Sequence, residues 1–470
     1  MTGSPQPVAG RTQPPTPGAL IGLLRTARDR FLPTGGLLLS VLLLGSYLLG
    51  LARDRIFART FGLGAELDAY NAAFVLPELL LDVLVEAGLA APFIPIFLQL
   101  RSEGDGREAD RFGRTILTAA TAVMAAAALV MFVFAEATTG FIAPGFTGEQ
   151  RELYAALFRV MLVTPILFAA SLTLGQVLLA EQRFVWYGTA PLLYNGGIIL
   201  GTLAFSGSLG IYGPAIGAVI GAGLHLASRF AGLRASRFRI GPDINIRTPA
   251  VREFVRLMLP KMVSHPVEPV TFLFFTAVAT TLAAGSVTAV SFARNFQSVP
   301  VTLIGVAFAL AAFPALSAAH AAGDRRAFVR HLGNGLASIA VITIGAAMVL
   351  LLVGELAIRV LLGGGAFDAE DVALTALVLG AFALAIPFES LTHLLSRGIY
   401  ATRHTLLQVL ASIAALGVTV LATLALLPAA GIVAIPLGFA IGQAAKVGLL
   451  GLAVAMRLRS WARTPVGASG

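Results

Sequence analysis

Long apolar segments separated by short polar connections dominate this chain, and this pattern restricts the folds it can adopt. A helix needs about 20 mostly apolar residues to cross the hydrocarbon core of a bilayer. Twelve segments have this character, at about 35–51, 69–100, 113–138, 153–180, 187–206, 211–228, 257–283, 286–318, 332–353, 372–396, 405–427 and 431–456. We predict an all-α polytopic membrane protein with about twelve transmembrane helices.

Composition excludes several other classes of protein. The chain is 57% hydrophobic and only 12% charged, whereas ordinary soluble domains carry about 25% charged residues. It contains no cysteine, and its six histidines show no metal-ligand spacing such as HExxH. Phosphate-binding GxxxxGK[ST] and nucleophile GxSxG motifs are absent from the sequence. We therefore expect a protein without enzyme activity, metal or cofactor. The energy for any transport would come from an H⁺ or Na⁺ gradient, the membrane potential or the substrate gradient.

Basic residues are distributed as membrane topology requires, because lysine and arginine gather in cytoplasmic loops. With a cytoplasmic N-terminus, 24 of the 33 Lys and Arg residues fall in inside segments and five in outside segments. The other four lie within predicted spans. We predict cytoplasmic N- and C-termini. The net charge of +9 then reflects topology and not nucleic-acid binding.

The longest polar connection divides the predicted spans into two sets of six. We expect a disordered or amphipathic cytoplasmic N-terminus at 1–34, an N-lobe at 35–228 and a basic cytoplasmic linker at 229–256. A C-lobe at 257–457 and a cytoplasmic tail at 458–470 complete the division. Two six-helix lobes of equal orientation form a parallel repeat, a transporter architecture that places its site between the repeats. We expect a monomer with a central cavity.

Carboxylates recur in the second predicted span. Glu78, Asp82 and Glu86 are four residues apart and share one helical face. Charged side chains are costly in the bilayer, so those present are expected to face protein or water. One interpretation is a cavity wall that binds protons or cations. In the alternative, Glu78 and Glu86 cap helix breaks near Pro77 and Gly88.

The seventh span begins LPKMVSHPVEP and contains Lys261, His265 and Glu268. Lys261 either snorkels to the cytoplasmic interface or faces the cavity. His265 and Glu268 lie deeper and are candidates for proton or cation coupling.

Two further spans carry charges. Arg294 and Asn295 lie eight to ten residues from the outer end of the eighth span, too deep for easy snorkelling, and we expect Arg294 to face inward. In the tenth span, Glu389 and His393 lie one turn apart. They form either a structural hydrogen-bonded pair or a proton-handling pair.

Several stretches are distinctive, namely GLARDRIFARTFGLGAELDAYNAAFVLPELL, EAGLAAPFIPIF, APGFTGEQRELYAALFRVMLVTPILF, LLAEQRFVWYGTAPLLYN, GVAFALAAFPALSAAHAAGD, GGGAFDAEDVALTA and LLSRGIYATRHT. They resemble the MurJ/MviN family of lipid II flippases in the MOP transporter superfamily, which implies a bacterial cytoplasmic membrane. The resemblance implies two lobes around a cationic cavity, which turn a polyprenyl-diphosphate-linked sugar across the membrane by alternating access. The implied partners are this lipid-linked oligosaccharide and membrane lipids.

Only some of the family's site residues have a match in this sequence. Arg53 and Asp54 match the opening ARD motif, and Asp68 matches the acid before the second span. The resemblance implies that these residues, with Arg294, Asn295 and Lys261, serve substrate binding.

This sequence departs from the family pattern in its arginines and in its number of spans. Family arginines of spans one, two and eight fall at Tyr47, Leu81 and Asn295. Family members usually have fourteen spans, of which the last two form a groove for the lipid tail, whereas twelve are predicted here. Residues 52–68 form the predicted outer connection between the first two spans, and we expect Arg55 and Arg59 in it to meet lipid headgroups.

Three functional hypotheses remain open on this sequence. The first is a flippase for lipid II or a related lipid-linked oligosaccharide. The second is an H⁺- or Na⁺-coupled exporter of a different substrate, motivated by Glu78, Asp82, Glu268 and Glu389. The third is a non-transporting scaffold, motivated by the lost arginines.

Overall fold

The computed structural model describes residues 34–104, 106–264, 267–402 and 404–461. Residues 1–33 of the predicted N-terminal segment and residues 462–470 of the predicted tail therefore lie outside the described residues. In the first half the elements are α2 (Thr34–Phe61), α3 (Ala65–Leu81), η1 (Asp82–Glu86), α4 (Ala87–Glu103), α5 (Arg107–Val133), α6 (Ala135–Ile142), α7 (Gly148–Met161), α8 (Val163–Ala180), α9 (Phe184–Leu209) and α10 (Tyr212–Leu233).

The second half is equally helical. Its elements are α11 (Pro249–Ser264), α12 (Val267–Ala279), α13 (Ser286–Pro300), η2 (Val301–Val306), α14 (Ala307–Ala321), α15 (Arg325–Leu361), α16 (Ala369–Ala383), α17 (Ile386–Ala401), α18 (Thr405–Ala430), η3 (Gly431–Val433) and α19 (Ala434–Trp461). Both η1 and η2 are π-helices. They interrupt the second span of each half.

The fold class is confirmed, but the count of twelve spans is not. Helices occupy every predicted range, and within the described residues seven helical stretches are long and apolar enough to cross a membrane. The pair α16 and α17, bent by 42°, makes an eighth if it counts as one span. The second and seventh spans are broken into α3, α4, α11 and α12, which have 17, 17, 16 and 13 residues. Each of these pieces is shorter than the about 20 residues that a crossing helix typically needs.

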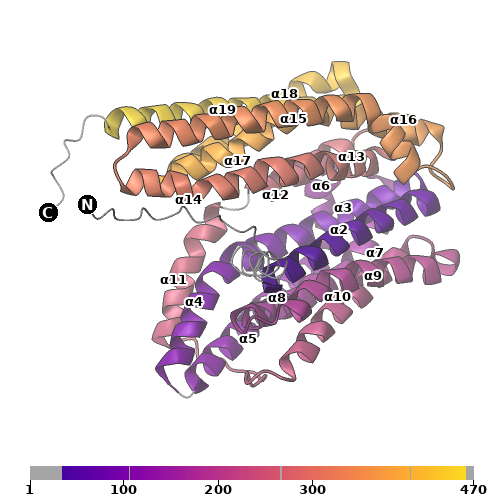
Figure 1. The fold of residues 1–470 in the computed structure, drawn as a ribbon. Coiled ribbons are helices and arrows are strands. Elements are labelled where there is room, and N and C mark those ends of the chain that lie inside the picture. The colour runs from indigo at the N-terminus through magenta and orange to yellow at the C-terminus, as the bar shows by residue number, and fades with distance from the viewer. Residues whose placement is uncertain (1–33, 105, 265–266, 403, 462–470) are drawn as a thin grey trace, which may run out of the picture.

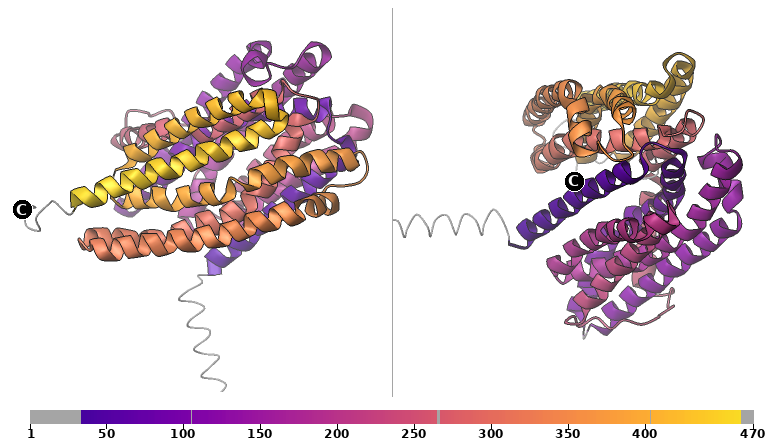
Figure 2. Two further views of the ribbon diagram at one scale, coloured as in Figure 1. Left: turned by 90° about the horizontal axis from the view of Figure 1, so that it is seen from above. Right: turned by 90° about the vertical axis from the view of Figure 1, so that its right-hand side faces the viewer.

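Two groups of helices form separate layers. Helices α2 to α10 make the N-lobe and α12 to α19 the C-lobe, seen as lower and upper layers in Figure 1 and edge-on in the right panel of Figure 2. Helix α11 packs against α4 and α5 of the N-lobe. Helices extend into both ends of the predicted linker, so the non-helical connection covers only residues 234–248.

The last two helices of the N-lobe cross at very close range. Gly197 and Gly201 of α9 face Gly221 and Gly217 of α10, and a Cβ added at either α9 position would overlap a Cα of α10. Small residues let helix backbones approach in this way in membranes. The C-lobe repeats the arrangement, because Gly438 and Gly442 of α19 leave no room for a Cβ beside threonines of α18.

We expect Gly217→Leu to destabilise the N-lobe strongly. The larger side chain would force α9 and α10 apart, and overpacking in tight interfaces costs about 1–3 kcal/mol or more. The melting temperature of the purified protein measures the effect. Gly207→Leu on α9 is the matched control, because a Cβ there meets open space, and equal melting temperatures of the two variants would contradict this account.

Two arginines near the end of α2 join the two lobes. Nη1 of Arg55 donates to the carbonyl oxygens of Val360 and Leu361 at 2.6 and 2.7 Å. Nε and Nη2 of Arg59 donate to the Gly363 oxygen at 3.0 and 2.9 Å. The last carbonyls of a helix lack helical partners and favour positive charge. These arginines therefore bind the C-terminus of α15, which corrects the expectation that they meet lipid headgroups.

The adjoining loops strengthen the same contact. The Ala366 amide donates to the Arg59 oxygen at 2.9 Å, and the Leu63 amide donates to Oδ2 of Asp371 at 2.9 Å. Gly62 has φ +62°, and a Cβ there would overlap the Ala366 oxygen. We call the contacts of residues 55–71 with residues 285–288 and 360–371 the outer seam.

Candidate functional site

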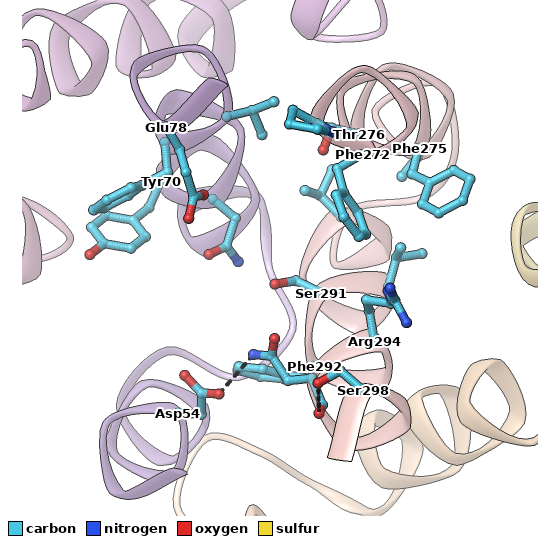
Figure 3. Close-up of a pocket in the computed structure, with 18 of the residues that line it drawn as sticks. Asp54, Tyr70, Glu78, Phe272, Phe275, Thr276, Ser291, Phe292, Arg294 and Ser298 are labelled. Carbon is cyan, nitrogen blue, oxygen red and sulfur yellow. Dashed lines mark hydrogen bonds between the residues drawn. The ribbon is translucent and has the colours of Figure 1, made fainter. Parts of the chain in front are cut away.

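A cavity of about 520 Å³ lies between α2 and α3 of the N-lobe and α12 and α13 of the C-lobe. Figure 3 shows Asp54 and Glu78 on one wall and Ser291 and Arg294 on the facing helix. Seven residues singled out from the sequence meet here, namely Arg53, Asp54, Glu78, Asp82, Glu268, Arg294 and Asn295. We call this space the central cavity.

Arg53 and Asp54 form an ion pair on α2, and Asp54 also bonds the facing helix. Nε and Nη2 of Arg53 donate to Oδ1 of Asp54 at 3.1 and 2.8 Å. The other oxygen of Asp54 accepts from Nδ2 of Asn295 at 2.9 Å, so this carboxylate joins α2 to α13. Nη1 of Arg53 also donates to Asn195 at 3.3 Å. The Arg53 side chain keeps 27% of its surface exposed, which leaves it accessible from the cavity.

The guanidinium of Arg294 is bound on the C-lobe side of the central cavity by Glu389 of α17. Its Nη2 and Nη1 donate to the two carboxylate oxygens of Glu389 at 2.7 and 3.0 Å, a bidentate pair. Gln297 bonds both partners. The guanidinium lies 5.1 Å from the ring centre of Phe272 and 5.2 Å from that of Phe439. Arg294 thus faces inward as predicted. Its charge is neutralised by Glu389, a buried acid that is 6% exposed.

Acidic side chains outnumber basic ones in the described lining of the central cavity. Two arginines stand beside four carboxylates, which are Asp54, Glu78, Asp82 and Glu268. Glu78 and Asp82 share a wall because they lie four residues apart on α3 and the start of η1. The cationic cavity implied by the family resemblance is therefore not found among the described residues.

Asp68 has a structural position and is not part of the described lining. Its carboxylate accepts hydrogen bonds from the Gly285 amide at 2.7 Å and from the amide and hydroxyl of Thr288 at 2.8 and 2.7 Å. It caps the N-terminus of α13, where free amides and the helix dipole favour a carboxylate. The assignment of Asp68 to substrate binding is corrected to a role in the outer seam.

Other predicted positions have mixed outcomes. His265 lies outside the described residues, as do the side chains of Lys261 and Glu86. Tyr47, in place of a family arginine, is 42% exposed on α2. Within the described ranges, no group of three or more His, Asp or Glu residues is arranged to hold a metal ion.

A second polar cavity, of about 220 Å³, lies inside the C-lobe. Glu389 and His393 of α17 line it together with Glu268 and Lys446. Arg294 lines this C-lobe cavity and the central cavity alike. The predicted pair Glu389 and His393 is thus part of one polar cluster, which the guanidinium of Arg294 joins to the central cavity.

Several lining residues were not singled out from the sequence. They are Tyr70, Asn71, Tyr194, Ser291 and Lys446. Polar residues within apolar spans were the available signal, as in the YN pair at 194–195. The spacing of such residues does not say which of them face a cavity.

Arg229, placed in the linker by sequence, is buried in α10 at 1% exposure. Its Nη1 donates to the carbonyl oxygens of Trp186 and Tyr187 at 3.0 and 2.9 Å. Pro191 has no N–H to offer the Tyr187 oxygen four residues before it. Arg229 therefore supplies the hydrogen bond that α9 loses at this proline.

We expect Arg229→Met to lower stability by about 1–3 kcal/mol, because a buried carbonyl loses its donor. Adding Pro191→Ala returns an N–H to the helix and should recover part of the loss. Thermal unfolding of the single and double variants measures both effects. No recovery in the double variant would show that Arg229 does not compensate for the proline.

Comparison with known proteins decides the family. The sequence profile described as "Lipid II flippase MurJ" matches residues 57–464. The chain belongs to the MurJ family. A protein of Borreliella burgdorferi called "Probable lipid II flippase MurJ" is 26% identical over 346 residues, which cover 74% of this chain and 68% of that protein.

Solved structures agree on the fold of this MurJ family member. A lipid II flippase MurJ in an inward closed conformation matches with a TM-score of 0.77 at 24% identity, covering 89% of this chain and 87% of that one. An inward-facing multidrug resistance MATE transporter of the MOP superfamily matches with a TM-score of 0.76 at 16% identity, covering 90% and 96%. The chain is thus a multi-pass bacterial membrane protein with a MOP-type transporter fold.

Proposed function

We propose that the chain is a flippase that moves a polyprenyl-diphosphate-linked cell-wall precursor, lipid II or a related lipid-linked oligosaccharide, across the cytoplasmic membrane. The family match over residues 57–464 carries this proposal. The flippase works by alternating access, as a monomer, and catalyses no bond-breaking step. Its N- and C-termini lie in the cytoplasm, which the distribution of basic residues supports.

The geometry suits the cytoplasm-facing stage of such a cycle. The outer seam holds the lobes together at the end predicted to be outer. The central cavity offers the Arg53 guanidinium and the hydroxyl of Ser291 to a diphosphate. Arginine is well matched to phosphate oxygens because its planar fork can donate two parallel hydrogen bonds.

Complementation tests the proposal. A bacterial strain depleted of its own lipid II flippase should grow when this chain is expressed in its membrane. Proteoliposomes containing the chain should also expose a labelled polyprenyl-diphosphate sugar on the opposite leaflet. Proper membrane insertion without growth and without transbilayer movement would overturn the proposal.

The four carboxylates of the central cavity favour a second candidate, a cation exporter coupled to H⁺ or Na⁺. Glu78 and Asp82 would attract a cationic substrate or the coupling ion. Under this alternative, transport of a lipophilic cation into proteoliposomes is driven by an imposed H⁺ or Na⁺ gradient and is lost in Asp82→Asn. A gradient without effect on cation uptake would exclude it.

A further inference from the structure

Arg294 is shared between two cavities that have no described carboxylate in common except Glu268. On one side lies the central cavity, where the proposed function places a diphosphate. On the other side Glu389 holds the guanidinium by two hydrogen bonds. An anion in the central cavity and Glu389 would therefore compete for the same cation.

The surroundings of Arg294 allow an exchange of partners. Phe272 and Phe439 contact its guanidinium without hydrogen-bonding it, and stacking on aromatic rings stabilises an arginine whichever anion it binds. Glu268 of α12 lies 3.9 Å from Nη2 and lines both cavities. The side chain can thus turn toward the central cavity without entering an apolar region.

Loss of Arg294 leaves Glu389 in an unfavourable state. Its carboxylate is 6% exposed and would keep only the hydrogen bond from Gln297 at 2.8 Å. Breaking a buried ion pair by removing one partner is strongly destabilising, because the remaining charge is uncompensated. Uptake of a proton removes that charge.

We propose that an anion bound in the central cavity takes Arg294 from Glu389, and that Glu389 then takes up a proton from the bulk solution through the C-lobe cavity. This inference rests on the proposed function and names the proton as its coupling ion. Anion binding and protonation of Glu389 promote each other, as linked equilibria must. Release of the anion returns Arg294 to Glu389 and the proton to water.

Charges around Glu389 favour a proton over a metal cation. The titratable groups lining the C-lobe cavity are Glu268 of α12, Arg294 of α13, His393 and Tyr400 of α17, and Lys446 of α19. The ammonium of Lys446 would repel a metal cation at this place. A proton neutralises the carboxylate without needing a coordination shell.

The test uses the full chain in detergent and inorganic pyrophosphate as the anion. Calorimetric titrations in two buffers of different ionisation enthalpy give the number of protons taken up per anion bound. Glu389→Gln removes the acceptor and frees Arg294, so it should bind pyrophosphate about tenfold more tightly. The wild type should take up about one proton more per pyrophosphate bound than this variant. Protons that pyrophosphate itself gains or loses on binding contribute equally in both proteins and cancel in this difference.

Glu355→Gln is the matched control, because Glu355 pairs with Arg359 at an exposed position on α15. It should behave as the wild type. Should Glu389→Gln not fold, infrared difference spectra of the wild type replace it, and pyrophosphate must then produce the band of a protonated carboxylic acid. Equal proton uptake per pyrophosphate bound in the wild type and in Glu389→Gln overturns the inference alone. Absence of any pyrophosphate binding overturns it together with the proposed diphosphate site.

Discussion

Arg53→Gln is expected to stop transport of the lipid-linked diphosphate while the protein still folds. Glutamine keeps a hydrogen bond to Asp54 but removes the positive charge. Of the two arginines in the described lining of the central cavity, Arg294 is held by Glu389 until an anion displaces it, so Arg53 is the arginine that the diphosphate meets first. A hydrogen bond to a charged group contributes about 1.5–3 kcal/mol, so substrate affinity should fall about 10- to 100-fold. Transbilayer movement in proteoliposomes measures the loss.

Two controls make the Arg53 result specific. Arg151→Gln removes an arginine that is exposed at the start of α7, and it should transport normally. Arg53→Lys keeps the charge but loses the planar fork of donors, so it should retain partial activity. Full activity of Arg53→Gln would mean that the diphosphate is neutralised elsewhere.

Asp68→Ala is expected to open the outer seam. The substitution removes three hydrogen bonds and leaves two amides of the first turn of α13 without an acceptor. Loss of an N-cap alone costs about 0.5–2 kcal/mol, and buried donors without partners add to this cost. The balance between conformations should shift toward those in which the central cavity is reached from the outside.

Cysteine labelling measures this shift, because the chain contains no cysteine of its own. A cysteine introduced as Ser291→Cys in the cavity wall should react faster with a membrane-impermeant thiol reagent applied from outside when Asp68→Ala is also present. Asp324→Ala is the matched control, since Asp324 caps α15 through the Ala327 amide at 2.8 Å outside the outer seam. Equal labelling in both double variants would contradict the role of Asp68.

Patterns within single helices could be predicted from the sequence. The apolar ranges indicated where helices lie, and the four-residue spacing of Glu78 and Asp82 indicated one shared wall. Breaks in the second span near Pro77 and Gly88 were one alternative drawn from the sequence. The π-helix η1 between them was not predicted, because a π-helix depends on contacts with neighbouring helices and has no distinct residue pattern. For this reason twelve apolar ranges did not become twelve uninterrupted spans.

Pairings between distant helices could not be predicted. Arg294 was expected to face inward, but its partner Glu389 is 95 positions away, and nothing in either segment indicates the other. Asp68 appeared to be a binding residue because it is acidic and matches a family position. Only the fold shows that the free amides of α13 lie beside it.

Alternating access also has a geometric consequence for the π-helices η1 and η2, which occupy matching places in the two lobes. A π-turn holds about one residue more than an α-turn, and one residue corresponds to a rotation of about 100° in an α-helix. Conversion of η1 to α-helix would change the phase of α4 relative to α3, and conversion of η2 would do the same for α14 relative to α13. Each lobe thus contains one helix whose second half, α4 or α14, can turn about its axis while its first half, α3 or α13, stays fixed to the cavity wall.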